Sequence, residues 1–347
     1  MNYIGSKRTL LGFIEKSIED VTGGNYSSVC DLFAGTGVVG RHFKKLGKSI
    51  YSNDIQYYSY VLNRNYIENR TKLEFRGILE DVPGLIATEN KYSCVCNYLS
   101  NIKGIEGFIF DNYCLGGSGS RMYYSDENGK KCDAVRQTIE QWHNEKKISD
   151  DEYFFLLCSL LESIDKVANT ASVYGAFLKR LKGSAMKKLE IAPAEILLGT
   201  KDYKVFNDDA NSVVRKIKAD VLYLDPPYNQ RQYATNYHLL ETIAKYDNPD
   251  IHGKTGLRNY SSQKSAYCSR ALVKDSFRDL VENANVKYIF LSYNNEGLMT
   301  PSDVRKIMSI RGEYGCFEEK YQRYKADSGR DYSAKTTTEY LHFVKCA

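Results

Sequence analysis

The stretch that decides the fold is SVCDLFAGTGVVG, residues 28–40. Its first six residues form a short apolar run, which predicts a buried strand. A glycine cluster follows, and then Val38, Val39, Phe43 and Leu46 recur at helical spacing. Because a strand, a tight loop and a helix follow one another in this order, the stretch predicts the beginning of a doubly wound α/β sheet.

The same alternation of strands and helices continues further along the chain. A second strand is predicted at residues 49–51 and a helix over residues 55–69. After a long gap, apolar β-rich runs predict further strands at 205–206, 221–224, 288–292 and 340–344. The order of these elements favours a mostly parallel, Rossmann-like sheet.

The gap between the two parts of this pattern covers residues 71–204. It contains a polar, glycine-rich piece at 116–131 and two predicted helices, at 132–144 and 151–168. A segment of this length is too long for a simple connection within a compact domain. We therefore expect a mainly helical module, residues 71–204, inserted between the two halves of the sheet domain, residues 1–70 and 205–347.

The composition indicates a globular protein outside membranes. The 347 residues are 42% hydrophobic and 26% charged, which excludes a disordered chain or a coiled coil. The longest apolar run, residues 153–158, is far shorter than the roughly 20 residues that a membrane helix needs. Residues 1–11 lack the apolar core and cleavage site of a secretory signal. We expect a cytoplasmic protein with no membrane association.

Cysteine and tyrosine are the two residue types whose numbers call for an interpretation. None of the nine cysteines forms a C-x-x-C pair, and a zinc cluster of Cys94, Cys96, Cys114, Cys132 and His143 lacks the usual ligand spacing. We therefore expect reduced cysteines and no metal site. The 29 tyrosines could stack on nucleotide bases, but we attribute most of them to a compositional bias.

The net charge of +5 is mild, yet it hides two local concentrations of cations. Residues 179–188 and 251–270 contain several Lys and Arg residues and no acidic residue. Most such runs are simply solvated surface, but rings, amides and serines accompany the second run, as in loops that contact phosphates. The candidates for DNA contact are Lys179, Arg180, Lys187, Lys254, Arg258, Lys264 and Arg270.

The glycine loop after the first strand has the chemistry of a nucleotide site. Gly35 and Gly37 let the backbone approach a ligand where side chains would clash. With Gly40, and with Asp54 as the following acid, the loop also matches the dinucleotide pattern G-x-G-x-x-G. Asp31, directly before the loop, suits a ligand that carries an ammonium group, because it would repel a pyrophosphate.

A second site is Asp-Pro-Pro-Tyr at residues 225–228, at the end of the predicted strand 221–224. The two prolines fix the loop and leave its carbonyl groups available as acceptors. Asp225 and the carbonyl of Pro226 can accept both hydrogens of an exocyclic amino group. The ring of Tyr228 can stack on a base that has left the double helix.

Four elements in this order resemble the Dam-like, α-group adenine-specific DNA methyltransferases, in particular those of restriction-modification systems. The elements are NYIGSK at 2–7, the glycine loop at 31–40, SND at 52–54 and LDPPY at 224–228. The resemblance covers about residues 1–70 and 205–347, and it is much thinner over residues 71–204. There the family places its DNA target-recognition region.

The resemblance implies that S-adenosylmethionine is the cofactor and double-stranded DNA the substrate, with a cognate restriction endonuclease as an optional partner. It implies catalytic roles for Asp225, Pro226 and Tyr228. The implied cofactor site consists of Tyr3, Lys7, Asp31, Phe33, Gly35, Gly37, Asp54, Asp225 and either Asp208 or Asp209, of which we choose Asp209. At position 3 the family often has a Trp, which offers a larger ring than Tyr3 does.

The implied mechanism is a direct methyl transfer to the adenine amino group. Hydrogen bonds to Asp225 and Pro226 would raise the electron density on an amino nitrogen that is otherwise a poor nucleophile. Methylation of cytosine C5 would instead need a cysteine nucleophile. Cys30 is the cysteine nearest the two loops in the sequence, and we expect it to point into the sheet.

Residues 229–237, NQRQYATNY, directly follow the catalytic loop. Their position and composition predict that Arg231 and Tyr233 face DNA together with the basic segment 251–270. A surface salt bridge is an equally good interpretation of Arg231.

Three alternatives remain open. The same loop could grip the amino group of a cytosine or of an RNA base, although RNA enzymes of this kind usually lack so large an insertion. An NAD-dependent oxidoreductase would explain the glycine loop but neither Asp31 nor residues 225–228. A catalytically inactive DNA-binding protein would have no need of intact motifs.

Overall fold

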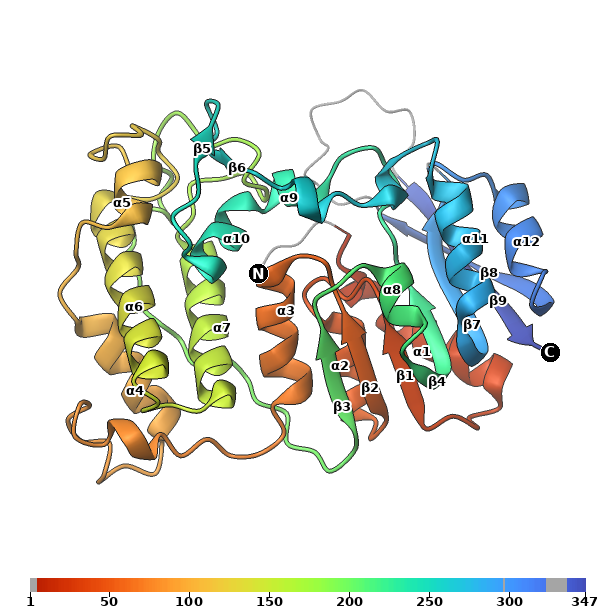
Figure 1. Ribbon diagram of the computed structural model, residues 1–347, viewed down its shortest axis with the longest axis horizontal. Helices are drawn as coiled ribbons and strands as arrows, with labels where there is room; N and C mark the ends of the chain where they lie inside the picture. Colours follow the sequence, from red (N-terminus) through yellow and green to blue (C-terminus); the bar gives the residue numbers. More distant parts are fainter. Residues whose placement is uncertain (1–4, 296, 323–335) are drawn as a thin grey trace. The chain divides into compact units, whose positions relative to one another are not determined.

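A seven-stranded sheet forms the centre of the computed structural model, which describes residues 5–295, 297–322 and 336–347. The strands lie in the order β3-β2-β1-β4-β7-β9-β8 (Figure 1). Their bounds are β1 Ser28–Asp31, β2 Ser49–Asn53, β3 Tyr203–Phe206, β4 Lys218–Leu224, β7 Asn285–Asn294, β8 Gly312–Gln322 and β9 Thr336–Cys346.

The five strands from β3 to β7 are parallel, and β9 runs antiparallel to both of its neighbours. The prediction of a mixed α/β fold with a mostly parallel sheet is thereby confirmed. Strand β8 was missed because its sequence, GEYGCFEEKYQ, has no apolar run. It lies at the edge of the sheet, where charged side chains can point into solvent.

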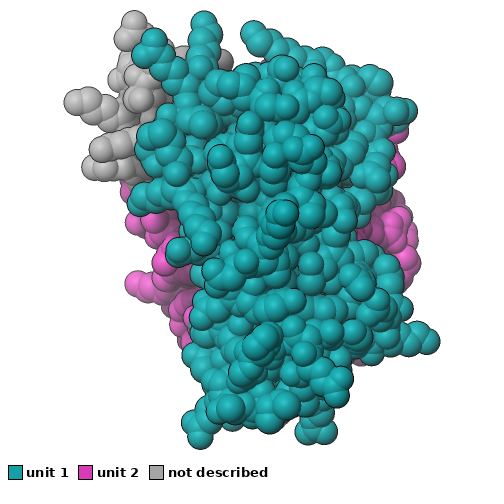
Figure 2. Space-filling view, turned by 90° about the vertical axis from the view of Figure 1, so that its left-hand side faces the viewer, with its two compact units in different colours: residues 1–4, 64–198, 234–260 teal, residues 5–63, 199–233, 261–347 magenta. Residues whose placement is uncertain are grey.

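The chain divides into two compact units, shown in different colours in Figure 2. The sheet unit comprises residues 5–63, 199–233 and 261–347. The helical unit comprises residues 64–198 and 234–260, together with the first four residues, which lie outside the described part. Residues 234–260 thus belong to the helical unit, whereas the sequence analysis assigned them to the sheet domain.

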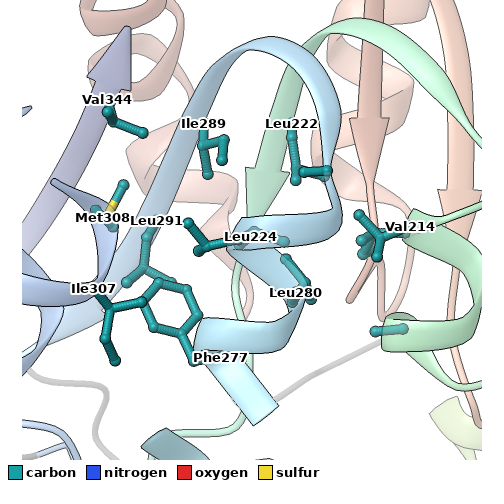
Figure 3. Close-up of a cluster of buried hydrophobic side chains, with 14 of the residues drawn as sticks. Val214, Leu222, Leu224, Phe277, Leu280, Ile289, Leu291, Ile307, Met308 and Val344 are labelled. Carbon is teal, nitrogen blue, oxygen red and sulfur yellow. The ribbon is translucent and has the colours of Figure 1, made fainter. Parts of the chain in front are cut away.

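The sheet unit buries one face of its strands beneath three helices. Side chains of β1, β4, β7 and β9 meet those of the helices α8, α11 and α12 in one apolar cluster (Figure 3). Cys30 belongs to this cluster and is 1% exposed, so it points into the core as expected. The helical segments of this unit are η1 Lys7–Leu10, α1 Leu11–Thr22, α2 Val38–Lys45, α3 Tyr57–Asn63, α8 Ala210–Val214, η4 Ser261–Gln263, η5 Ala266–Cys268, α11 Val273–Asn283 and α12 Pro301–Met308.

The helical unit is built around two long helices, α6 and α7. Its elements are η2 Arg64–Glu68, η3 Arg76–Ile78, α4 Lys91–Asn101, α5 Phe108–Tyr113, α6 Asp126–Asn144, α7 Asp150–Lys166, α10 His238–Lys245 and a small hairpin of β5 Ile251–His252 and β6 Leu257–Arg258. The short helix α9, Tyr233–Asn236, spans the division between the units.

The two helices predicted within the insertion are present, with one difference in length. Helix α7 lies within two residues of its predicted bounds. Helix α6 begins six residues before its predicted start at residue 132. Its first turn follows Ser125, whose side chain accepts a hydrogen bond from the N–H of Asn128. This N-cap starts the helix inside a glycine-rich segment that has a low intrinsic helix propensity.

Among the described residues, no helix has both the length and the apolar composition that crossing a membrane requires.

Candidate active site

The sheet places two of the predicted motifs side by side. Strand β1 lies between β2 and β4, and the strand order changes direction there. Asp31 ends β1, and Asp225 directly follows β4. In open α/β sheets, ligands bind outside the carboxyl ends of the strands at such a switch point. The loop after β1 and the loop after β4 therefore border the expected position of a ligand.

The glycine loop owes its shape to two residues with positive φ. Gly35 and Gly37 have φ values of 52° and 73°, in the left-handed region that favours glycine. A Cβ atom on Gly37 would lie 2.7 Å from Oδ1 of Asn63. The side-chain amide of Asn63 in turn donates a hydrogen bond to the carbonyl of Gly35, at 3.0 Å. Asn63 thus supports the loop from behind, and any side chain at position 37 would disrupt that contact.

Asp54 and Asn53 connect the glycine loop to the ends of the neighbouring strands. The carboxylate of Asp54 accepts hydrogen bonds from the backbone N–H groups of Gly35, at 2.8 Å, and Gln56, at 2.9 Å. The side-chain amide of Asn53 donates to the carbonyls of Leu32 and Asp208, at 3.1 and 3.0 Å. The loops after β1, β2 and β3 are thereby fixed together before any ligand binds.

Asp31 is a buried carboxylate that forms no ion pair with any described residue. It is 2% exposed, and its Oδ1 atom has no hydrogen-bond partner in the part of the chain that the structure describes. Burial and the nearby Asp225 carboxylate raise the pKa of Asp31 well above its ordinary value, although a backbone hydrogen bond from Phe33 opposes the shift. A buried acceptor of this kind is costly unless a donor or a cation binds it. The site is therefore suited to a ligand with an ammonium group.

Asp225 is a mostly buried carboxylate that has its own cation. The ammonium nitrogen of Lys7 lies 2.9 Å from Oδ1 of Asp225 and 3.0 Å from Oε1 of Glu339. Lys7 is 6% exposed and lies in η1, near the amino end of the chain. Its side chain therefore binds the carboxylate that directly precedes the two prolines. Whether Lys7 also contacts a cofactor stays a prediction.

Opposing electrostatic effects act on the pKa of Asp225. Burial and the Glu339 carboxylate raise the pKa of Asp225, the Lys7 ammonium lowers it, and the result is a pKa of about 6. At neutral pH the carboxylate is therefore mainly ionised. It can accept hydrogen bonds from a neutral amino group.

The rest of the loop after β4 is held against the sheet. The carbonyl of Tyr228 accepts a hydrogen bond from the N–H of Leu298, at 3.1 Å. The ring of Tyr228 is partly buried against the apolar cluster, as is that of Phe33, which packs edge-to-face on Tyr267 with centroids 4.9 Å apart. Pro226 is buried. Phe33 and Tyr228, two of the aromatic residues that the sequence assigned to the site, thus have partly buried rings near the strand ends.

The segment that follows residues 225–228 lies beside residues 261–270. Gln232 and Ser265 exchange two hydrogen bonds, of 2.8 and 3.2 Å. The thiol of Cys268 donates to the carbonyl of Arg231, at 3.5 Å. The structure thus joins the exposed Arg231 to the segment that carries the exposed Lys264 and Arg270. Tyr233, which begins α9, is half-buried.

The predicted basic segment 251–270 is divided between the two units. Residues 251–260 belong to the helical unit and residues 261–270 to the sheet unit. Lys254 lies in the exposed turn of the β5–β6 hairpin. Arg258 is different, because it is 7% exposed and makes two hydrogen bonds to Asp247, of 2.9 and 2.6 Å. Because the Arg258 side chain is buried and already paired with Asp247, we omit Arg258 from the DNA-contact set.

The turn of this hairpin, residues 253–256, is held by its backbone carbonyls. Each of the four carbonyls has a side-chain partner within the helical unit. The contacts are Arg121 to Gly253 and Lys254 at 3.0 and 3.1 Å, Tyr123 and His238 to Thr255 at 3.1 and 2.9 Å, and Tyr113 to Gly256 at 2.8 Å. Because its carbonyls are bound from within the unit, the turn is fixed with the Lys254 side chain exposed.

The other basic segment, residues 179–188, follows a loop that contacts Tyr123, the buried side chain that also binds the hairpin turn. The hydroxyl of Tyr123 also lies 2.7 Å from the carbonyl of Tyr174, and its ring contacts Phe177 edge-to-face. The loop is fixed further by the fully buried Asn169, whose side chain bonds the backbone of residues 122, 178 and 182. The exposed Lys179, Arg180 and Lys187 are therefore attached to the same internal network as the hairpin turn.

Asp209 and Tyr3 were also predicted to bind the cofactor. The carboxylate of Asp209 caps helix α8 by accepting from the N–H groups of Asn211 and Ser212, at 3.0 and 3.3 Å. That contact accounts for Asp209 as a structural cap, and its role toward a cofactor stays a prediction. Tyr3 lies outside the described residues.

Sequence reasoning missed three residues of this site, namely Asn53, Asn63 and Glu339. Asn53 directly precedes Asp54, so its position at a strand end was a usable signal. Glu339 directly precedes the predicted strand 340–344, so its position was also visible. Asn63 lies in a helical segment of polar and apolar residues, where nothing marks it as the support of Gly37.

Comparison with known proteins supports the resemblance to adenine-specific DNA methyltransferases. Residues 3–307 match the model of the D12 class N6 adenine-specific DNA methyltransferases. The chain is 49% identical to the type II methyltransferase M.NlaIII of Neisseria lactamica over 99% of both proteins. It is 33% identical to M.CviAII of Paramecium bursaria Chlorella virus 1, over 99% of this chain and 98% of that protein. It is 38% identical to M.FokI of Planomicrobium okeanokoites, over 99% of this chain and 52% of that protein.

Proposed function

The chain belongs to the D12 class N6 adenine-specific DNA methyltransferase family, and we propose that it transfers the methyl group of S-adenosylmethionine to an adenine flipped out of double-stranded DNA. The relatives named above are type II methyltransferases. We therefore propose that this enzyme protects specific DNA sites in the cytoplasm as the modification enzyme of a restriction-modification system. The site assignment rests on one observation: strands β1 and β4 are parallel neighbours, so Asp31 and Asp225 lie at adjacent strand ends.

The residues around Asp31 fit S-adenosylmethionine. The unpartnered Oδ1 of Asp31 would bind the cofactor's ammonium group, and Asp54 would bind its ribose hydroxyls. The glycine loop, with Gly35 and Gly37 in left-handed conformations, would let the backbone approach the ligand. When bound, S-adenosylmethionine supplies a methyl group activated by an adjoining positive sulfur atom.

Asp225 would prepare the target amino group. Its ionised carboxylate would accept one amino hydrogen, and the carbonyl of Pro226 would accept the other. The contact with Lys7 fixes the direction of the carboxylate, because an ammonium 2.9 Å away holds one of its oxygens. Both hydrogen bonds strengthen as positive charge develops on the nitrogen, so they stabilise the transition state more than the ground state.

Tyr228 and Phe33 would shape the pocket for the flipped base. Both rings are partly buried against the apolar cluster, and the carbonyl contact with Leu298 fixes the backbone of Tyr228. A fixed ring loses little conformational entropy when a base stacks on it. Stacking of this kind contributes about 1 to 3 kcal/mol per base in single-strand complexes.

We propose that the helical unit contains the target-recognition region. The order of the motifs along the chain, with the glycine loop before the catalytic loop and most of the helical unit between them, corresponds to the α-group of these enzymes. The exposed cations Lys179, Arg180, Lys187 and Lys254 lie on backbone segments joined through Tyr123. Fixed cations of this kind can position DNA through its phosphates.

On the sheet unit, we propose a second DNA contact formed by Arg231, Lys264 and Arg270. The hydrogen bonds between Gln232 and Ser265 hold the segments of these cations together. Because this region directly follows the catalytic loop, its phosphate contacts would orient the strand that carries the target base.

The DNA contact in the hairpin can be tested by Lys254→Ala. Each lost phosphate contact should reduce the slope of log affinity against log salt by about 1. Lys103→Ala is the matched control, since Lys103 is an exposed lysine of the same unit outside both basic segments. Equal salt slopes for wild type and Lys254→Ala would exclude this contact.

The proposed reaction can be tested with labelled S-adenosylmethionine and unmethylated double-stranded DNA, followed by digestion to nucleosides. We expect the label in N6-methyladenine. Label in N4-methylcytosine would overturn the adenine assignment and support the cytosine alternative. Absence of transfer to any DNA or RNA would contradict the enzymatic function as a whole.

A further inference from the structure

Tyr267 is a buried tyrosine of the sheet unit without a role in the proposed reaction. It lies in η5 and is 2% exposed. Its hydroxyl group donates to Oδ1 of Asn211, at 2.9 Å, and to the carbonyl of Ser276, at 3.3 Å. Its backbone N–H donates to the hydroxyl of Ser265, at 3.2 Å. Because the residue is held at its backbone and at the far end of its side chain, the direction of its ring is fixed.

The ring of Tyr267 contacts the glycine loop through Phe33. The two rings pack edge-to-face, with centroids 4.9 Å apart and planes inclined by 75°. Phe33 lies in the loop between β1 and α2, and its side chain has no polar atom that could form a conventional hydrogen bond. Its ring is only partly buried, so packing decides where the ring lies. Since edge-to-face pairs prefer a particular geometry, the fixed ring of Tyr267 restricts the positions open to Phe33.

The hydroxyl of Tyr267 is connected to a second residue of the predicted cofactor site. Asn211, which accepts from this hydroxyl, lies in the first turn of α8 and donates its backbone N–H to Asp209, at 3.0 Å. The resemblance assigns both Phe33 and Asp209 to the cofactor. Tyr267 thus contacts one of these residues directly and the other through Asn211.

A ligand that packs against Phe33 gains from a ring that is already held in place. A ring that moves freely in a loop loses conformational entropy when a ligand packs against it, and this loss weakens binding. We propose that Tyr267 is a positioning residue for the cofactor, which acts by holding the ring of Phe33 ready for S-adenosylmethionine. This inference rests on the proposed function, because it assigns Tyr267 to the cofactor site of the same reaction.

The test compares two substitutions of Tyr267 in the full-length chain, with the affinity for S-adenosylmethionine measured by calorimetry. Tyr267→Phe removes the hydroxyl and keeps the ring, whereas Tyr267→Leu removes both, so the two variants differ in the ring alone. We expect Tyr267→Phe to bind within about twofold of the wild type. Tyr267→Leu should bind roughly three- to tenfold more weakly, as the loss of an aromatic pair predicts. Equal affinities of the two variants would overturn the proposal.

A double-mutant cycle tests whether Tyr267 acts through Phe33. Phe33→Leu should itself weaken cofactor binding, and an unchanged affinity would leave Tyr267 nothing to act through. In the Phe33→Leu background, Tyr267→Leu should weaken binding by less than about twofold further, because the ring that it positions is gone. Full additivity of the two losses would contradict the proposal, since it would indicate a general loosening of the sheet unit.

Tyr26→Leu is the matched control. Tyr26 is 6% exposed and packs edge-to-face on Phe43, with centroids 6.2 Å apart and planes inclined by 74°. It precedes β1, at the end of the strand opposite the glycine loop. The same substitution therefore breaks the same kind of ring pair in the same unit, away from Phe33. Its cofactor affinity should stay within about twofold of the wild type, and a loss equal to that of Tyr267→Leu would overturn the proposal.

Steady-state kinetics separate positioning of the cofactor from a loss of folded enzyme. Tyr267→Leu should raise KM for S-adenosylmethionine and leave kcat within about twofold of the wild type, because a saturating cofactor compensates for weaker binding. A smaller folded fraction would instead lower the apparent kcat without a change in KM. That second pattern, with an unchanged affinity by calorimetry, would refute the role of Tyr267.

Tyr267→Met provides a further variant should Tyr267→Leu fail to fold, because the flexible Met side chain adapts to an irregular space. The same loss of cofactor affinity is expected, and an affinity equal to that of Tyr267→Phe would overturn the proposal. A wild-type protein that neither binds S-adenosylmethionine nor transfers its methyl group would instead refute the proposed function. A wild type that binds the cofactor, together with an unimpaired Tyr267→Leu variant, refutes only the role of Tyr267.

Discussion

Asp31 ends strand β1, and Asp225 directly follows the neighbouring parallel strand β4. The surroundings of the two carboxylates differ in one respect. Asp225 contacts the ammonium of Lys7 at 2.9 Å, whereas Asp31 forms no ion pair within the described residues. Burial raises the pKa of both carboxyl groups, but the cation beside Asp225 limits its pKa to about 6. The charge of Asp225 is thus compensated by a lysine of the protein, whereas Asp31 has no such partner among the described residues.

This difference indicates what each carboxylate is expected to bind. A carboxylate that already has a cation can accept hydrogen bonds from a neutral amino group. A buried carboxylate without a cation instead has most to gain from a ligand that brings a positive charge. In the proposed function, Lys7 therefore distinguishes the carboxylate assigned to the substrate from the carboxylate assigned to the cofactor. Four predictions test this comparison.

The largest effect is expected when the cation beside Asp225 is removed. Lys7→Met would leave Asp225 and Glu339 buried without their shared ammonium, and breaking a buried ion pair costs about 3 to 5 kcal/mol. Denaturant unfolding of the ligand-free protein at pH 7 should detect this loss. Lys287→Met is the control, because the Lys287 side chain is exposed where it pairs with Asp220, and its loss should change stability far less. Equal losses in both variants would contradict the comparison.

Removal of the charge on Asp225 itself should mainly affect catalysis. Asp225→Asn keeps the shape of the side chain but weakens its acceptor, and we expect kcat to fall by roughly 10² to 10³. Cofactor affinity, measured by calorimetry, should change much less, since the cofactor's ammonium is assigned to Asp31. A large loss of cofactor affinity with little change in kcat would reverse the two roles.

The converse result is expected for Asp31→Asn. This variant should bind S-adenosylmethionine about 10 to 100-fold more weakly, because a hydrogen bond to a charged group contributes about 1.5 to 3 kcal/mol. The ligand-free protein should be as stable as the wild type or more so, since a buried unpaired charge is removed. A clear loss of stability without cofactor would show that Asp31 has a partner in the protein.

The smallest effect is a dependence on pH. Asp225 must be ionised to accept hydrogen bonds from the target amino group, and its pKa is about 6. The value of kcat should therefore be constant above that pH and decrease below it, by up to tenfold per unit. Cofactor affinity should also weaken in acid, because protonation of Asp31 removes the charge that binds the ammonium. A kcat that stays constant down to pH 4.5 would contradict the ionised role of Asp225.

The sequence predicted the local features of the site well. A glycine cluster after an apolar run requires a tight loop at a strand end, and Asp-Pro-Pro-Tyr requires a rigid one, so both loops could be placed from short stretches of chain. The mostly parallel sheet followed from the alternation of strands and helices. Strand β8 could not be found in this way, because an edge strand with charged side chains lacks the apolar pattern of a buried one.

The division into units was harder to read from the sequence. Residues 234–260 follow the sheet-unit segment 199–233 in the chain. Even so, Arg136 binds the carbonyls of Ile243 and Ala244 and attaches helix α10 to α6. Arg258 was also predicted to contact DNA, but in the structure its buried side chain pairs with Asp247. Residue type alone does not reveal whether a charged side chain is exposed or already paired.

What the sequence determined by itself was the fold class, the two loops at the switch point and the chemistry that they can perform. Only the tertiary structure decided which charges are compensated. Lys7, Asp225 and Glu339 come from the beginning, the middle and the end of the chain, and no local pattern relates them. Hydrogen bonds and sterics within a few residues fix a loop, whereas the charge state of a buried group depends on every charge within a few ångströms, whatever its position in the sequence.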